Sequence, residues 1–330
     1  METIVPGQTV ATQLAEATPT TRLFDEGLCE AATRHERMMA EARGIIDAGD
    51  ERGVVLRLTG GVAVRHYAID LEFAEREYSD IDLIGLRRQS GDLTDLFGDL
   101  GYVENVYVAT ATGAGQRQFF MPAHDPASRS EVAERGEPAL PVYAAVPPSD
   151  HIDVFLDAMK MDHEVEMRDR LTINTYAISP ADIFLSKLQI VRLNEKDAHD
   201  VITLCKDVYV DFEDRPGVLN LTRVADACAR DWGLYIDVMG NIDIVLERLG
   251  FYDLTVREYT RVRRTLELAQ DMMTEVSKTL RWRLRARVGK RVKWYREVEE
   301  TFAAPVEEAQ VAVRTKVGRA PEDPSEGGSD

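Results

Sequence analysis

The chain has 330 residues, of which 44% are hydrophobic, so it can bury the core of one large domain or of two modest domains, and we expect two. Its formal net charge of −18 argues against a surface that binds nucleic acid throughout, because phosphate contacts require concentrated cations. Three widely spaced cysteines indicate neither a disulfide scaffold nor a zinc site, and no apolar stretch approaches the roughly 20 residues that span a bilayer, so we expect a cytoplasmic protein.

The first predicted elements lead to a pair of glycines. Residues 1–21 lack periodicity and predict a mobile N-terminus, and a helix is expected over 24–48. The β-branched, apolar run 54–58 predicts a strand that ends at Thr59.

Gly60 and Gly61 follow this strand. Neither has a Cβ, so the backbone can turn sharply and approach a bulky anion. The spacing of apolar residues predicts a helix over 62–73, and its N-terminus would direct free N–H groups at the same place. A triphosphate fits such a site.

Acidic and apolar residues alternate over 80–84 and predict a second strand, with Asp80 and Asp82 on one face. Carboxylates about 6–7 Å apart along a strand can bind one or two hard cations. Asp153, in a predicted strand over 151–155, is the expected third acid. Such a triad serves two-metal displacement at a nucleotide phosphate, so the pattern indicates nucleotidyl transfer.

Each motif also has a non-catalytic interpretation. A Gly-Gly pair often forms only a turn, and Asp-x-Asp is often a solvated strand face or part of a loop. Their order along the chain favours the catalytic interpretation. We interpret His151 and His199 as polar neighbours of the site rather than as ligands.

Beyond the second strand, the pattern predicts a short helix near 93–100 and strands near 102–109 and 116–121. A polar, Pro- and Gly-bearing stretch over 122–141 predicts a surface loop. An edge strand is expected over 171–178, and helices from there onward.

A mostly apolar, buried helix is predicted to start at Ser179 as N-cap and contains a single lysine, Lys187. This lysine extends to the surface, pairs with an acid, or reaches the triphosphate as a cation from a second domain. A second helix begins near Lys196, with Asp197 and Asp200 on one face. For Asp200, a role at the site, a helix cap and a contact with Lys196 are all left open.

The order of Gly60-Gly61, Asp80-x-Asp82 and Asp153 resembles the polymerase β-like nucleotidyltransferase superfamily, and the match covers about half of the chain. The resemblance implies that the glycines contact the phosphates of an NTP and that Asp80 and Asp82 bind Mg²⁺. It implies that Asp153 binds the catalytic metal and helps to activate the acceptor. The interval between the glycines and Asp80 is longer than in compact members, which predicts an extra turn or a longer helix.

The lysine of the first helix, Arg192 and the run Lys196-Asp197-x-x-Asp200 are similar to the second-domain signature of the AbiEii-type nucleotidyltransferases. That group includes toxins of toxin–antitoxin and phage-defence systems. The resemblance implies that Lys187 contacts the nucleotide and that Asp197 is needed at the site, and it makes an antitoxin a candidate partner.

From Lys278 to Arg296 every charged residue is basic, with Trp and Tyr among them. The Arg281–Arg296 stretch could hold RNA by phosphate contacts and stacking. The alternative is a helix packed against the acidic remainder of the protein through a buried stripe. That stripe comprises Leu280, Leu284, Val288 and Val292. Alternation also permits a strand, but the length favours a helix.

The expected fold is α/β, with a mixed-sheet nucleotidyltransferase core, followed by an α-helical domain. The expected boundaries are 1–21 for the N-terminus, 22–178 for the core, 179–304 for the helical domain and 305–330 for a disordered acidic tail. The expected reaction moves an NMP from an NTP, with Mg²⁺, to an RNA end, a protein hydroxyl or a small molecule. The alternative is a non-catalytic nucleotide-binding or RNA-binding protein with the same fold.

Overall fold

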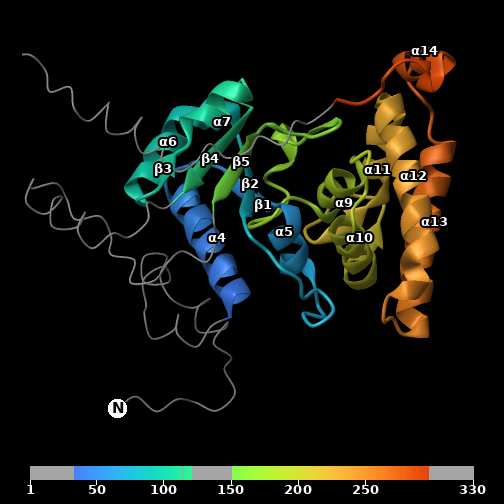
Figure 1. Cartoon of the computed structure of the whole chain (residues 1–330), viewed down its shortest axis with the longest axis horizontal. Helices are drawn as coiled ribbons and strands as arrows, with labels where there is room; N and C mark the ends of the chain where they lie inside the picture. Colours follow the sequence, from blue (N-terminus) through green and yellow to red (C-terminus); the bar gives the residue numbers. More distant parts are fainter. Residues whose placement is uncertain (1–32, 114, 121–150, 297–330) are drawn as a thin grey trace, which may run out of the picture.

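The computed structural model describes residues 33–113, 115–120 and 151–296 (Figure 1). The predictions for the N-terminus, for the loop over 122–141 and for the acidic tail lie outside these residues. So does the beginning of the helix predicted over 24–48.

A mixed five-stranded sheet forms the centre of the N-terminal half, as the alternating and apolar patterns predict. Its strands lie in the order β1-β2-β5-β4-β3; β2 and β5 are parallel, and the other pairs are antiparallel. The strands are β1 Leu56–Thr59, β2 Ile81–Gly85, β3 Val103–Glu104, β4 Gln116–Phe120 and β5 Ile152–Leu156. The two parallel strands are buried at most positions, which places the core on both faces of the sheet.

The described residues of this half contain the helices α4 Arg34–Glu51, α5 Gly60–Tyr67, α6 Ser90–Asp99 and α7 Val106–Ala111. A capping box between Thr33 and Glu36 starts α4, which contacts β1 and α6. Figure 1 shows α6 and α7 near β3 and β4, whereas α5 lies toward the helical half. The short 3₁₀ segment Arg87–Gln89 leads into α6.

Helices dominate the chain after Ser179, as predicted. They are α9 Pro180–Leu188, α10 Glu195–Asp207, α11 Leu221–Arg230, α12 Trp232–Arg248, α13 Val256–Glu275 and α14 Leu280–Val288. Figure 1 shows α9 and α10 between the sheet and the long helices α12 and α13. Two small strand pairs accompany them: the hairpin β6 Ala158–Lys160 with β7 Glu164–Glu166, and the parallel pair β8 Tyr209–Asp211 with β9 Val218–Asn220.

The core runs through both halves. Buried side chains form one continuous cluster from Met38 in α4 to Met273 in α13, and α5 packs directly on α9 and α10. The Tyr67 hydroxyl also donates to the carbonyl of Ile178 at 2.9 Å. The sheet half and the helical half therefore share one hydrophobic core, and a boundary between two domains near residue 178 stays a prediction.

The helix predicted over 62–73 has different ends in the structure. It begins at Gly60, and it ends at Tyr67, after which residues 68–80 form a loop. The backbone N–H groups of Ile69 and Asp70 donate to the Asp207 carboxylate at 2.9 and 3.1 Å. These contacts with α10 stabilise a loop conformation that the local pattern does not indicate.

Two predicted strands are largely wrong. Over 102–109 only Val103–Glu104 is a strand, and the β-branched residues that follow form α7. Over 171–178 there is only an isolated bridge between Ala177 and Leu58 of β1. The segment before this bridge is held by Arg57, which donates to the carbonyls of Leu171 and Asn174 at 3.0 and 2.9 Å. β-Propensity alone does not decide between these outcomes, because packing partners override it.

Candidate active site

Two predicted acids lie side by side on the central strands. Asp82 of β2 and Asp153 of β5 are register partners on adjacent parallel strands. Asp80 and His151 stand one residue before the starts of these same strands. Parallel pairing therefore brings together acids that are far apart in the sequence.

Three of these side chains could hold a metal ion. One ligand atom from each of Asp80, His151 and Asp153 lies within 4.8 Å of the other two. His151 Nε2 is 3.3 Å from Asp153 Oδ2 and 3.8 Å from Asp80 Oδ2. His151, interpreted from the sequence as a polar neighbour, thus occupies a potential ligand position beside the predicted acids.

Gly60 lies against Asp82, the second of the acids on β2 and its approach. A Cβ at this position would be 1.9 Å from Asp82 Oδ2, and Gly60 has a φ of +66°. Both the close approach and the left-handed conformation therefore require glycine. Thr59, the register partner of Asp82 on β1, has a buried hydroxyl oxygen with no hydrogen-bond partner. A polar group held in this way suits a site that binds a further ligand.

The acids repel one another. Burial, together with the charges of Asp80 and Asp153, raises the pKa of Asp82 to about 7. The hydrogen bond to Asp153 raises the pKa of His151, although burial opposes this. A bound cation would relieve the repulsion among the carboxylates, because opposite charge favours their ionised form.

The donor set fits Mg²⁺ in part. Carboxylate oxygens are ligands that Mg²⁺ prefers, whereas imidazole suits transition metals better. Gln118 Nε2 donates to Asp153 Oδ1 at 3.2 Å and helps to orient that carboxylate. Asp80, His151 and Asp153 are the described residues whose ligand atoms come together, and Mg²⁺ binding by Asp80, Asp82 and Asp153 stays a prediction.

Lys187 lies beside this group and is paired with two acids. Every residue of α9 except Lys187 is buried, and its Nζ is 2.9 Å from Asp197 Oδ1 and 2.8 Å from Asp200 Oδ2. Burial disfavours the charged lysine, but Asp200 and Asp197 more than offset this and raise its pKa. The charge of Lys187 also partly offsets the rise in the pKa of Asp82. The acid-pairing interpretation of Lys187 is thus confirmed, and its contact with a nucleotide stays a prediction.

Asp200 pairs with a loop arginine and with Lys187, and not with a helix end or with Lys196. Asn194 is the N-cap of α10 and accepts the N–H of Asp197 at 2.8 Å. Asp200 instead accepts two hydrogen bonds from Arg76, at 3.0 and 2.9 Å, and pairs with Lys187. Neither a helix cap nor a contact with Lys196 is seen for Asp200, because its carboxylate pairs with Arg76 of the 68–80 loop and with Lys187 of α9.

Arg76 is a site residue that the sequence analysis missed. A Cβ on Gly61 would lie 2.0 Å from Arg76 Nη2, so the guanidinium rests on the Gly60-Gly61 turn. The guanidinium also stacks on Tyr78, 4.2 Å from the ring centroid. The long interval between the glycines and Asp80 was the available signal, because it forms the loop that carries Arg76.

His199 packs between aromatic rings rather than among the acids. Its ring stacks on Phe73 at 4.8 Å and on Tyr252 at 5.9 Å between centroids. Burial lowers its pKa. It contributes to the contact between the 68–80 loop and α10.

The basic stretch is helical over α14, but its predicted buried stripe is wrong. Leu280, Leu284, Val288 and Val292 are 66%, 52%, 42% and 58% exposed. Contacts with α12 instead come from Arg285, which lies over the Trp232 ring, and from Trp294, which donates to Asp237 at 2.9 Å. Arg285 also donates to the carbonyls of Gly289 and Val292 within the stretch, both at 2.7 Å. The other α14 arginines remain exposed.

Comparison with protein-family models, with curated proteins and with solved structures found no match. Within the part of the chain that the structure describes, no helix has the length and apolar character needed to cross a membrane. The functional argument therefore depends on the site itself.

Proposed function

We propose that the protein is a Mg²⁺-dependent nucleotidyltransferase with a polymerase β-like core followed by a helical domain of the AbiEii type. The observation that carries the proposal is the pairing of Asp82 with Asp153 on adjacent parallel strands, with Asp80 alongside. The Gly60 turn packed on Asp82 supports it. This arrangement combines a cation site with a glycine turn at the start of a helix.

The chain's own residues have separate roles in this reaction. Asp80 and Asp82 orient the donor through the metal site, and the metal, when bound, neutralises charge on the phosphates. Arg76 lies where the phosphates of the donor are expected and can bind them through its planar fork. Lys187 supplies positive charge beside Asp82.

The bond changes balance without a redox partner. A hydroxyl oxygen of the acceptor attacks the α-phosphorus of the NTP, and a new P–O bond forms. The bond between the α-phosphorus and the bridging oxygen breaks, and pyrophosphate leaves with the electron pair. Asp153, which lies at the acid cluster, takes the proton of the acceptor hydroxyl.

The direct test is pyrophosphate release from each of the four NTPs, with and without Mg²⁺, in the presence of total RNA, of protein or of a small-molecule extract. We expect turnover with at least one NTP and one acceptor class, and its loss in Asp80→Asn/Asp82→Asn. Asp95→Asn is the matched control, because Asp95 is an exposed acid on α6 away from the site. Equal turnover in the double variant and in the wild type would contradict the site assignment.

A non-catalytic nucleotide-binding protein with the same fold is the second candidate. The observation in its favour is that Arg76 and Lys187 are already paired with acids. Mg²⁺-dependent NTP binding without pyrophosphate release under any acceptor condition would support this alternative.

The acceptor and the partners are further parts of the proposal. Exposed arginines on α14 support RNA binding through the Arg281–Arg296 stretch. The resemblance to AbiEii-type toxins supports an antitoxin as a protein partner. Transfer of label from NTP to RNA, and not to protein or small molecules, would identify the acceptor.

A further inference from the structure

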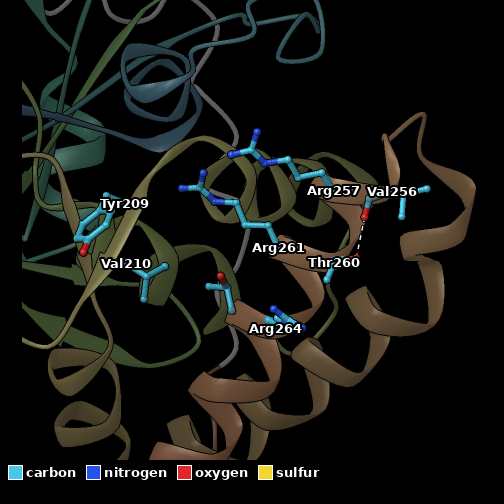
Figure 2. A pocket seen from close by; sticks show the side chains of 8 residues that line it. Tyr209, Val210, Val256, Arg257, Thr260, Arg261 and Arg264 are labelled. Atoms are coloured by element: carbon cyan, nitrogen blue, oxygen red, sulfur yellow. Dashed lines mark hydrogen bonds between the residues drawn. The ribbon is translucent and has the colours of Figure 1, made fainter.

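A cavity of about 760 Å³ lies between α13 and β8, and none of its lining residues belongs to the candidate active site (Figure 2). Among the described residues that line it, three are arginines, Arg257, Arg261 and Arg264, and none is acidic. This is a local excess of positive charge on a protein with a net charge of −18.

The arginines share one face of α13, because they are separated by four and three residues. Like charges at this spacing repel one another, which disfavours the cluster unless something compensates it. Arg261 donates to the carbonyl of Val208 at 2.7 Å, which holds it across the cavity. Figure 2 shows Arg257 and Arg261 extending from α13 on the side that faces β8.

The opposite wall offers an aromatic ring. Tyr209 is 66% exposed although it belongs to β8, and Val256 beside the arginines is 85% exposed. Guanidinium forks match phosphate oxygens, and an exposed tyrosine ring can stack on a base. The cavity therefore combines the two kinds of contact that a nucleotide requires.

We propose that this cavity binds the phosphate and base of a nucleotide unit, either as a free nucleotide or within a single strand. The site is separate from the proposed donor site, and the inference does not require that the protein be a nucleotidyltransferase. An acidic peptide would satisfy the arginines but would leave the Tyr209 ring without a stacking partner, so a nucleotide is favoured.

The test measures binding of fluorescein-labelled octaadenylate RNA, and separately of ATP, in EDTA so that the metal site is not loaded. We compare the wild type with Arg257→Gln/Arg264→Gln and with Tyr209→Ala. The matched control is Arg263→Gln, on the same helix but outside the cavity and paired with Glu267 at 2.8 Å. The α14 arginines stay intact in every variant.

We expect the double variant to weaken binding at least tenfold, and the control to change it less than twofold. For RNA, the slope of the logarithm of affinity against the logarithm of salt concentration should become shallower by about 1.4 units, because two phosphate contacts are lost. Tyr209→Ala should weaken binding without changing that slope. If the double variant loses affinity for ATP alone, the ligand is a free nucleotide. If it loses affinity for RNA alone, the ligand is a nucleotide within a strand.

Three results would overturn the proposal. One is unchanged affinity for both probes in the double variant. Another is an equal loss in Arg263→Gln, which would indicate a general charge effect. The third is polyglutamate binding as tight as RNA binding and equally sensitive to the double variant, which would assign the cavity to an acidic protein. Melting temperatures of the variants show that binding is compared between folded proteins. If the first variant fails to fold, Arg257→Lys/Arg264→Lys keeps the charges.

Discussion

Asp82 carries much of the unfavourable electrostatics of the site when no cation is bound. Its pKa is raised to about 7 from an ordinary value near 3.8 by burial and by Asp80 and Asp153. The folded state therefore binds this proton more tightly than the unfolded chain does. Stability falls as the pH rises from about 4 to about 7, and the full penalty is present above pH 7.

Asp82→Asn should accordingly stabilise the metal-free protein at pH 8, by on the order of 2 kcal/mol. The gain should shrink at pH 5, and Mg²⁺ should stabilise the wild type more than the variant. Urea unfolding in EDTA at the two pH values, with Asp95→Asn as control, checks this. A gain of the same size at both pH values would show that repulsion among the acids is not its cause.

The positive charge of Lys187 compensates the negative charges of two buried acids. The side chains of Asp197 and Asp200 are 8% and 1% exposed. Lys187→Met leaves both with less compensation and should destabilise the fold by about 3–5 kcal/mol. Adding Asp197→Asn should restore part of this loss. The measurements are urea unfolding and NTP affinity of both variants.

NTP affinity separates the two interpretations of Lys187. If it contacts the triphosphate, affinity stays low in the Lys187→Met/Asp197→Asn variant although stability recovers. Normal affinity in that variant would mean that Lys187 is only a structural partner of the acids.

At the scale of an element, the arginines of α14 differ in their contacts. Arg281, Arg283 and Arg287 are exposed, whereas Arg285 bonds to two carbonyls and stacks on Trp232. Replacing the three exposed arginines with Gln should weaken RNA binding and leave the melting temperature within about 1 °C, because surface changes have small effects. Arg285→Gln should lower the melting temperature by several degrees. Electrophoretic shift and thermal unfolding test both, and unchanged RNA binding in the triple variant would remove α14 from the proposed acceptor site.

At the scale of the whole molecule, ion pairs connect the 68–80 loop to the helical half. Arg76 binds Asp200, and Asp70 binds Lys206 at 3.2 Å. Asp200→Ala leaves Arg76 and Lys187 without this acid and should cost about 3–5 kcal/mol. Hydrogen exchange should increase in residues 68–80 more than in β2 or β5. A uniform increase throughout the molecule would show that the loop is not selectively held by these pairs.

The candidate site was partly predictable because several of its signals are local. The glycine turn after a strand, the alternation of Asp80 with apolar residues and the strand around Asp153 follow from backbone freedom and the two-residue period of a strand. The N-cap Ser179 and the apolar character of α9 are local in the same way.

The sequence by itself therefore determined where the acids and glycines stand on their elements, since that depends on neighbours along the chain. Only the tertiary structure decided that Asp82 adjoins Asp153 and that Arg76 rests on the Gly60-Gly61 turn. It also decided that Asp200 binds Arg76 rather than Lys196, and that the helix predicted to 73 ends at Tyr67. Those outcomes depend on strand register and on contacts between distant segments, which no local pattern encodes.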